Sequence, residues 1–379
     1  MKLIKGGVTS PRGFKANGFW AGIKKSGKPD LGLICADVMC NAAAVFTINS
    51  VKAAPVVVCQ KNLKTGKIQA LLANSGNANC FTGEYGFMYA RRMTELVAEK
   101  MGIDAAHVFV MSTGIIGRTF PYEKIRVAIP SLFKGLSAKR GVSFARAIMT
   151  TDTIDKQIAV TTQIGGKTVT VGACAKGSGM IEPNMATMLA CVTTDCAITT
   201  PMLQKALKDA VDVSFNAITV DGCMSTNDMV SLMASGLAGN RTISAAGQDY
   251  QLFVEALKAA CVKLARDIVV DGEGASKFFE IKVTGAKDFK QARDAAMKVA
   301  NSNLVKTADY TDNPNWGRVA AAIGACGFKA VTETSLKIDF SVKRNTIYIN
   351  ADLGQGDAQA IVYTCDLTHK YIDINGKYN

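Results

Sequence analysis

The run from Lys176 to Ala190 limits most strongly how this chain can fold. It begins as a loop with two glycines, and Pro183 fixes the backbone before the next element. The sequence then turns apolar from Met188 to Val192, a length that favours a buried strand. Thr187 stands at this junction. We therefore expect it to begin a core strand, with its hydroxyl held rigidly at the floor of a pocket.

The composition is that of a globular protein. The 379 residues are 48% hydrophobic and 20% charged, enough for a large core in two lobes. No run approaches the length of a membrane span, and no apolar segment follows Met1, so we expect neither a membrane anchor nor a secretory signal. The 11 cysteines include no CxxC pair, which indicates reduced core residues of a cytoplasmic protein rather than a zinc site. We expect no metal and no other cofactor.

The formal net charge of +13 raises the question of a nucleic-acid partner. The lysines and arginines are scattered along the chain and cluster no further than isolated doublets, and no nucleic-acid-binding motif is present. A basic surface also favours the capture of small anions such as amino-acid carboxylates. We therefore expect small-molecule substrates and no nucleic-acid partner.

Helical and strand patterns alternate along the chain, which predicts a mixed α/β protein. Residues 7–58 are typical of strands joined by glycine turns, and the polar run 215–228 is typical of a cap for a following helix. We predict a core of residues 1–282 and a smaller C-terminal α/β lobe of residues 283–379. Helices are expected at 86–101, 120–136, 201–214, 253–264 and 289–301, and strands at 31–36, 108–111, 158–164, 168–174, 278–284, 336–342, 346–349 and 360–364.

Two turns place polar groups where chemistry could use them. Thr113 and Gly114 follow an apolar strand, and such a turn can aim a hydroxyl and a backbone N–H at one point, as an oxyanion hole requires. Taken alone, this turn is more often an ordinary one. Glu273 lies between two glycines and should be accessible, although a solvated turn carboxylate is the simpler interpretation.

Four segments, in order, resemble the ornithine/glutamate N-acetyltransferases of arginine biosynthesis. They are residues 112–117, 176–190, 271–277 and 313–318, and the resemblance extends from Gly7 to Asn375. In that family the peptide bond before a threonine breaks autocatalytically, and the freed threonine becomes the nucleophile. The resemblance places this break between Ala186 and Thr187, giving fragments 1–186 and 187–379.

The residue types suit that chemistry. A threonine hydroxyl is a weak nucleophile at neutral pH and needs an adjacent base. Cleavage would give Thr187 an α-amine whose pKa is about 8, close enough to neutral to accept the hydroxyl proton. Before cleavage the same hydroxyl can attack the Ala186 carbonyl and form an ester that water resolves, and the small Ala186 leaves room for the intermediate.

The resemblance also implies roles for individual residues. Thr113 and Gly114 would stabilise the oxyanion. The family usually continues to a terminal serine or threonine that binds substrate, whereas this chain ends at Asn379, which weakens the expected C-terminal wall of the pocket. The implied substrate contacts are Thr153, Lys176, Thr187, Glu273 and Asn375.

The implied activity is a ping-pong transfer. Thr187 would take acetyl from N-acetylornithine and hand it to glutamate; some family members also accept acetyl-CoA, and the residues here leave that second donor open. By the same resemblance the fold is a layered α/β sandwich with mixed sheets, similar to N-terminal-nucleophile enzymes. Two copies of each fragment are the expected assembly.

Two alternatives remain from the sequence. An amidohydrolase or aminopeptidase could use the same self-processing scaffold with water in place of glutamate. The joint presence of Lys176 and Glu273 favours an amino-acid substrate that carries both charges. A non-catalytic basic binding protein is the third possibility, and it predicts a single uncut chain of 40.2 kDa.

Overall fold

The structure is a computed structural model that describes residues 1–182, 188–308 and 315–377. The chain divides into two compact units, and each is described by itself. The first unit comprises Met1–Gly177, Asn184–Val211 and Met224–Leu264. The second comprises Ser178–Pro183, Asp212–Cys223 and Ala265–Asn379.

One mixed sheet organises the first unit. Its described strands follow the order β1-β6-β7-β8-β9-β3-β4-β5, and β2 pairs with β3 outside this path. The pairs β4–β5 and β8–β9 are parallel, and the other pairs are antiparallel. The strands are β1 (Lys2–Ile4), β2 (Phe14–Phe19), β3 (Leu31–Phe46), β4 (Lys67–Asn77), β5 (Val108–Ile115), β6 (Lys156–Ile164), β7 (Lys167–Lys176), β8 (Leu189–Thr194) and β9 (Met229–Ala234).

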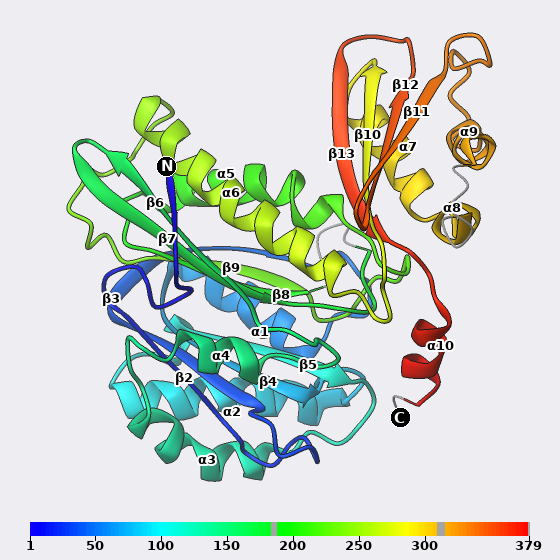
Figure 1. The fold of residues 1–379 in the computed structure, drawn as a ribbon. Helices are drawn as coiled ribbons and strands as arrows, with labels where there is room; N and C mark the ends of the chain where they lie inside the picture. The colour runs from blue at the N-terminus through cyan, green and yellow to red at the C-terminus, as the bar shows by residue number, and fades with distance from the viewer. Residues whose placement is uncertain (183–187, 309–314, 378–379) are drawn as a thin grey trace. The chain divides into compact units, whose positions relative to one another are not determined.

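Helices cover this sheet (Figure 1). α1 and α2 pack against each other and against β5, while α4 packs on β2 and β3. The apolar residues Phe253, Leu257 and Leu264 of α6 are fully buried, as the helical spacing predicts. The helices that lie wholly or mainly in this unit are α1 (Ala54–Asn62), α2 (Gly83–Met101), α3 (Tyr122–Lys134), α4 (Gly141–Ala147), α5 (Thr200–Asp212) and α6 (Gln248–Val270).

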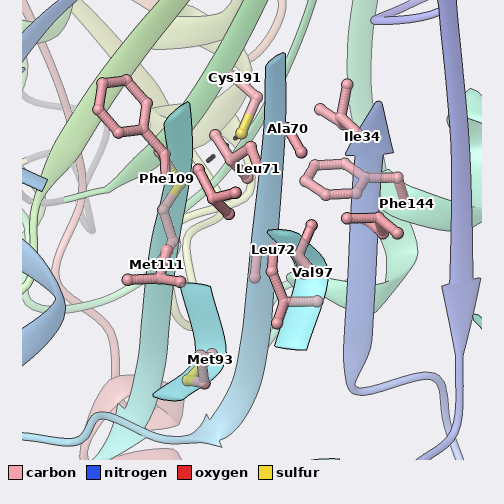
Figure 2. Close-up of a cluster of buried hydrophobic side chains, with 14 of the residues drawn as sticks. Ile34, Ala70, Leu71, Leu72, Met93, Val97, Phe109, Met111, Phe144 and Cys191 are labelled. Atoms are coloured by element: carbon pink, nitrogen blue, oxygen red, sulfur yellow. Dashed lines mark hydrogen bonds between the residues drawn. The ribbon is translucent and has the colours of Figure 1, made fainter. Parts of the chain in front are cut away.

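The core of the first unit lies where β3, β4 and β5 meet helices α2 and α4 (Figure 2). Leu71 and Phe109 from the strands and Phe144 from α4 have no exposed surface. Cys191 of β8 contacts Met111 of β5, with 3.7 Å between the sulfur atoms. Each buried side chain of this size contributes about 1.5–3 kcal/mol, so the strand ends project from a rigid base.

The second unit has its own mixed sheet in the order β11-β12-β10-β13, with β10 and β12 parallel. Helix α7 packs on β10 and β13 through the fully buried alanines Ala292, Ala295 and Ala296, whose small side chains allow a close approach. The elements are β10 (Phe278–Ala286), α7 (Phe289–Ala300), α8 (Asn303–Ala308), α9 (Trp316–Gly324), β11 (Lys337–Lys343), β12 (Thr346–Asp352), β13 (Ala358–Cys365) and α10 (His369–Gly376).

The predicted fold class, α/β with mixed sheets, is confirmed. Two local predictions were wrong. Residues 54–62 form α1 instead of a strand, because Pro55 suits the first turn of a helix and Val56 and Cys59 pack into the interior. The run 215–228 leads into the buried strand β9 rather than a helix. The predicted boundary at 282–283 falls within β10, and the division there stays a prediction.

The cysteines are all free, and nine of the eleven are buried. Cys223 is exposed and Cys326 is half-buried, so the prediction that all are core residues was wrong for these two. Across the described ranges, no helix is both long and apolar enough to cross a membrane.

Candidate active site

Lys176 is the last residue of β7, and it lies opposite Leu189 at the start of β8. Its side chain is only 7% exposed. The Lys176 Nζ atom donates a hydrogen bond of 3.5 Å to Oγ1 of Thr113, near the end of β5. The structure therefore brings together two residues that the sequence placed in the site, 63 positions apart in the chain.

Gly114 occupies a position that only glycine can fill. Its φ is +124°, and an added Cβ would lie 2.5 Å from the carbonyl carbon of Gly76 and 2.7 Å from the backbone nitrogen of Asn77. The register of β4 against β5 shifts at the same point. The Thr113–Gly114 turn is thus pressed against the neighbouring strand, which fixes the direction of its backbone groups.

A buried ion pair supports the end of β7. The side chains of Asp152 and Lys156 are completely buried, with 2.7 Å between carboxyl oxygen and Nζ. The Asp152 carboxylate also accepts the N–H of Gly177 at 2.7 Å and that of Thr150 at 2.9 Å. Burial alone would raise the Asp152 pKa, but the charges of Lys176 and Lys156 and the hydrogen bonds from Lys156 and Thr150 lower it to about 2. Asp152 is therefore ionised at neutral pH and holds the backbone beside Lys176.

In the second unit, Glu273 is the centre of a smaller group. It is 8% exposed, and its Oε2 atom accepts a hydrogen bond of 2.6 Å from Nδ2 of Asn375 in α10. The backbone N–H of Glu273 donates to the Ser178 carbonyl at 2.9 Å. A Cβ on Gly179 would lie 2.3 Å from the Glu273 carboxyl, so glycine is required there for the carboxyl to pack against the backbone at this position.

Asp221 holds the segment that leads toward the predicted cleavage point. Its carboxylate accepts the backbone N–H groups of Met180 at 2.6 Å and Ile181 at 2.8 Å. It also accepts the hydroxyl of Tyr371 at 3.1 Å. Burial and the Asp221 charge together raise the pKa of Tyr371, so the phenol stays protonated as the donor.

The family model of ArgJ matches residues 15–343 and 335–379. The two matches together cover nearly the whole chain. This chain belongs to the ArgJ family. Two relatives named "Arginine biosynthesis bifunctional protein ArgJ" are each 45% identical to it. The protein of Symbiobacterium thermophilum matches over 100% of both chains, and that of Geobacillus kaustophilus over 99% of this chain and 97% of its own.

A solved structure is also similar to this ArgJ chain. It is the ornithine acetyltransferase of Mycobacterium tuberculosis complexed with ornithine, at 38% identity and a TM-score of 0.45. The match covers 49% of the ArgJ chain and 99% of the solved chain.

The site residues expected from sequence fall into two groups in this ArgJ chain. Thr113, Gly114 and Lys176 lie together in the first unit, and Glu273 and Asn375 lie together in the second. Thr153 is exposed in the first unit, next to the buried Asp152. The predicted cleavage residues Ala186 and Thr187 lie outside the described residues, and β8 begins two positions later at Leu189.

The sequence predicted no role for Asn227 and Asp228, which directly precede β9. The Asn227 amide donates hydrogen bonds to the carbonyls of Ala78 at 2.5 Å and Ser112 at 2.8 Å, which braces the strand just before Thr113. Asp228 is buried as well. The available signal was the apolar run 229–234, which marks a buried strand and makes the polar residues just before it strand-end residues.

Within residues 1–182, 188–308 and 315–377, no group of three or more histidine, cysteine, aspartate or glutamate side chains could hold a metal ion. The chemistry available at these sites is that of hydroxyls, lysine, carboxyls and backbone N–H groups.

Proposed function

We propose that this protein is a glutamate N-acetyltransferase of arginine biosynthesis that moves acetyl from N-acetylornithine to glutamate. The observation that carries the proposal is the full-length match, at 45% identity, to proteins named for arginine biosynthesis. The same proposal places the enzyme in the cytoplasm and leaves acetyl-CoA open as a second donor.

Maturation comes first in this proposal. The Thr187 hydroxyl attacks the Ala186 carbonyl, the peptide bond breaks, and water resolves the resulting ester. The products are fragments 1–186 and 187–379, assembled as two copies of each. The new α-amine of Thr187 then serves as the base for its own hydroxyl.

Acetyl transfer follows in two halves. The Thr187 oxygen adds to the acetyl carbonyl of N-acetylornithine, and the Thr113 hydroxyl and the Gly114 backbone N–H stabilise the oxyanion. Ornithine leaves with the proton, and the amine of glutamate takes the acetyl group in the reverse sequence. The contact between Lys176 and Thr113 supports this arrangement, because it sets a buried cation beside the oxyanion turn.

Substrate recognition uses opposite charges. Lys176 would bind the substrate carboxylate, and Glu273 would bind its amino group. Asn375 donates to the Glu273 carboxyl and so sets its direction, while the exposed Thr153 supplies a further polar contact.

Initial-rate kinetics with both substrates test the proposal. We expect parallel-line ping-pong kinetics and acetylglutamate as the product. Thr187→Ala should abolish both cleavage and transfer, whereas Thr161→Ala, on strand β6, should leave both intact. Acetate release without transfer to glutamate would indicate an amidohydrolase instead. Normal turnover by Thr187→Ala would overturn the threonine mechanism.

A further inference from the structure

Asp228 lies at the N-terminal ends of β8 and β9, two parallel strands in the middle of the sheet. The register of β8 and β9 pairs Leu189 with Met229, which puts Asp228 beside Met188. The Met229 N–H donates to the Met188 carbonyl at 3.2 Å, and the Asp228 carbonyl accepts the N–H of Thr47 at 3.0 Å. Main-chain bonds to both neighbouring strands therefore fix the position of Asp228.

The side chain of Asp228 also contacts Met188, the residue that its main chain lies beside. A hydrogen bond from the Met188 backbone N–H and another from the Ser225 side chain reach its carboxyl group. The nitrogen of Met188 is bonded directly to the carbonyl carbon of Thr187. The carboxyl thus contacts the backbone of the residue that directly follows the threonine to which the proposed function gives both the cleavage and the nucleophile role.

One oxygen of this carboxyl is left without a hydrogen bond among the described residues. Asp228 is only 2% exposed, and its Oδ2 atom has no hydrogen-bond partner within the part of the chain that the structure describes. Burial raises the pKa of Asp228 well above its usual value, and the hydrogen bonds and the charge of Lys176 only partly oppose this. Burial thus favours the protonated form of this carboxyl, and its unpartnered oxygen is available for proton exchange.

Asp195, just past the other end of β8, shows what a structural aspartate looks like in the same unit. It is 1% exposed, and both of its oxygens are used: Oδ1 accepts the Thr170 N–H at 2.7 Å and Oδ2 accepts the Arg12 N–H at 3.1 Å. An unpartnered buried oxygen costs about 1–3 kcal/mol, which a purely structural role for Asp228 does not explain.

We propose that Asp228 is the proton-transfer residue for breaking the Ala186–Thr187 peptide bond. This inference rests on the self-cleavage in the proposed function. The Thr187 oxygen bonds to the Ala186 carbonyl carbon, and the bond from that carbon to the Thr187 nitrogen breaks. The Asp228 carboxyl gives its proton to the departing nitrogen and recovers one from the threonine hydroxyl. Water then hydrolyses the ester, which leaves the Ala186 carboxylate and restores the hydroxyl.

The test compares three full-length variants with the unaltered protein. Intact mass spectrometry follows the conversion of the full chain to fragments after purification. Asp228→Asn keeps the volume and an acceptor for the Met188 N–H but cannot supply a proton, so we expect cleavage at least about 100-fold slower. Asp228→Glu keeps the acid and should cleave faster than Asp228→Asn. Asp195→Asn is the matched control and should cleave within about twofold of the unaltered rate.

The outcomes separate the two proposals. Cleavage of Asp228→Asn at close to the unaltered rate overturns the role of Asp228 and leaves the proposed function standing. An unaltered protein that stays whole yet transfers acetyl overturns the proposed maturation itself. Thermal unfolding shows whether each variant is folded. If Asp228→Asn is unfolded, Asp228→Glu decides: cleavage within about tenfold of the unaltered rate supports the role, and none overturns it.

Discussion

The two groups of site residues are built in different ways. The group in the first unit stands on the ends of β5 and β7, where Lys176, Thr113 and Gly114 are fixed by sheet pairing and by a fully buried ion pair. The group in the second unit stands on the turn after α6 and on the short helix α10, and its exposed Asn375 reaches Glu273 through one hydrogen bond. Groups that act on a transition state need fixed positions, whereas substrate-recognition contacts can tolerate more freedom.

The largest effect is expected from breaking the buried pair. Asp152→Ala leaves the Lys156 charge buried without its carboxylate, and we expect the free energy of unfolding to fall by about 3–5 kcal/mol. Denaturant unfolding measures this loss. Asp155→Ala is the control, because its ion pair with Arg146 lies at the surface and should contribute less than about 1 kcal/mol. Equal losses in the two variants would contradict the rigid character of the first group.

Gly114→Ala tests the oxyanion turn. The added Cβ meets the backbone of Gly76 and Asn77 and must push the turn away, so we expect kcat/KM to fall about 100-fold, as when one oxyanion donor is lost. Gly117→Ala is the comparison: its φ of +79° is also left-handed, but no atom lies within 4 Å of the added Cβ. A similar loss in both variants would mean that strain alone, and not the turn's position, explains the effect.

Acid titration tests the charge state of the same region. The Asp152 pKa is lowered to about 2 in the folded protein, below the ordinary 3.8. A carboxyl of this kind stabilises the fold fully above its unfolded pKa, and the stabilisation disappears as the pH falls from about 4 to about 2. The shift corresponds to about 2 kcal/mol. Unfolding free energies measured across that window should fall in the unaltered protein, and the Asp152 share of the fall should vanish in Asp152→Asn.

The smallest effect is expected in the second group. Asn375→Ala removes one hydrogen bond to the Glu273 carboxyl and should raise KM for the amino-acid substrate by no more than about tenfold, since such a bond contributes about 1 kcal/mol. The kcat value should change little. Asp373→Ala, exposed on the same helix, should leave both constants unchanged. A large fall in kcat for Asn375→Ala would show that this group is as tightly fixed as the first.

Sequence periodicity was sufficient where local pattern and burial agree. The hairpin of β6 and β7, the helices α5 and α7, and the strands of the second sheet lie close to their predicted ranges. It failed where packing decided the outcome. The valines of α1 favour a strand locally, yet they cover β5 as a helix. Asn227 and Asp228 look like loop residues until the sheet places them between β3 and β8.

The central claim is that acetyl is carried on Thr187. Mass spectrometry of the protein, denatured soon after mixing with N-acetylornithine and without glutamate, tests it most directly. The account predicts a fragment that begins at Thr187 and is heavier by one acetyl group, and later addition of glutamate should remove the added mass. An intact chain, or an active enzyme whose 187–379 fragment never gains this mass, would contradict the account.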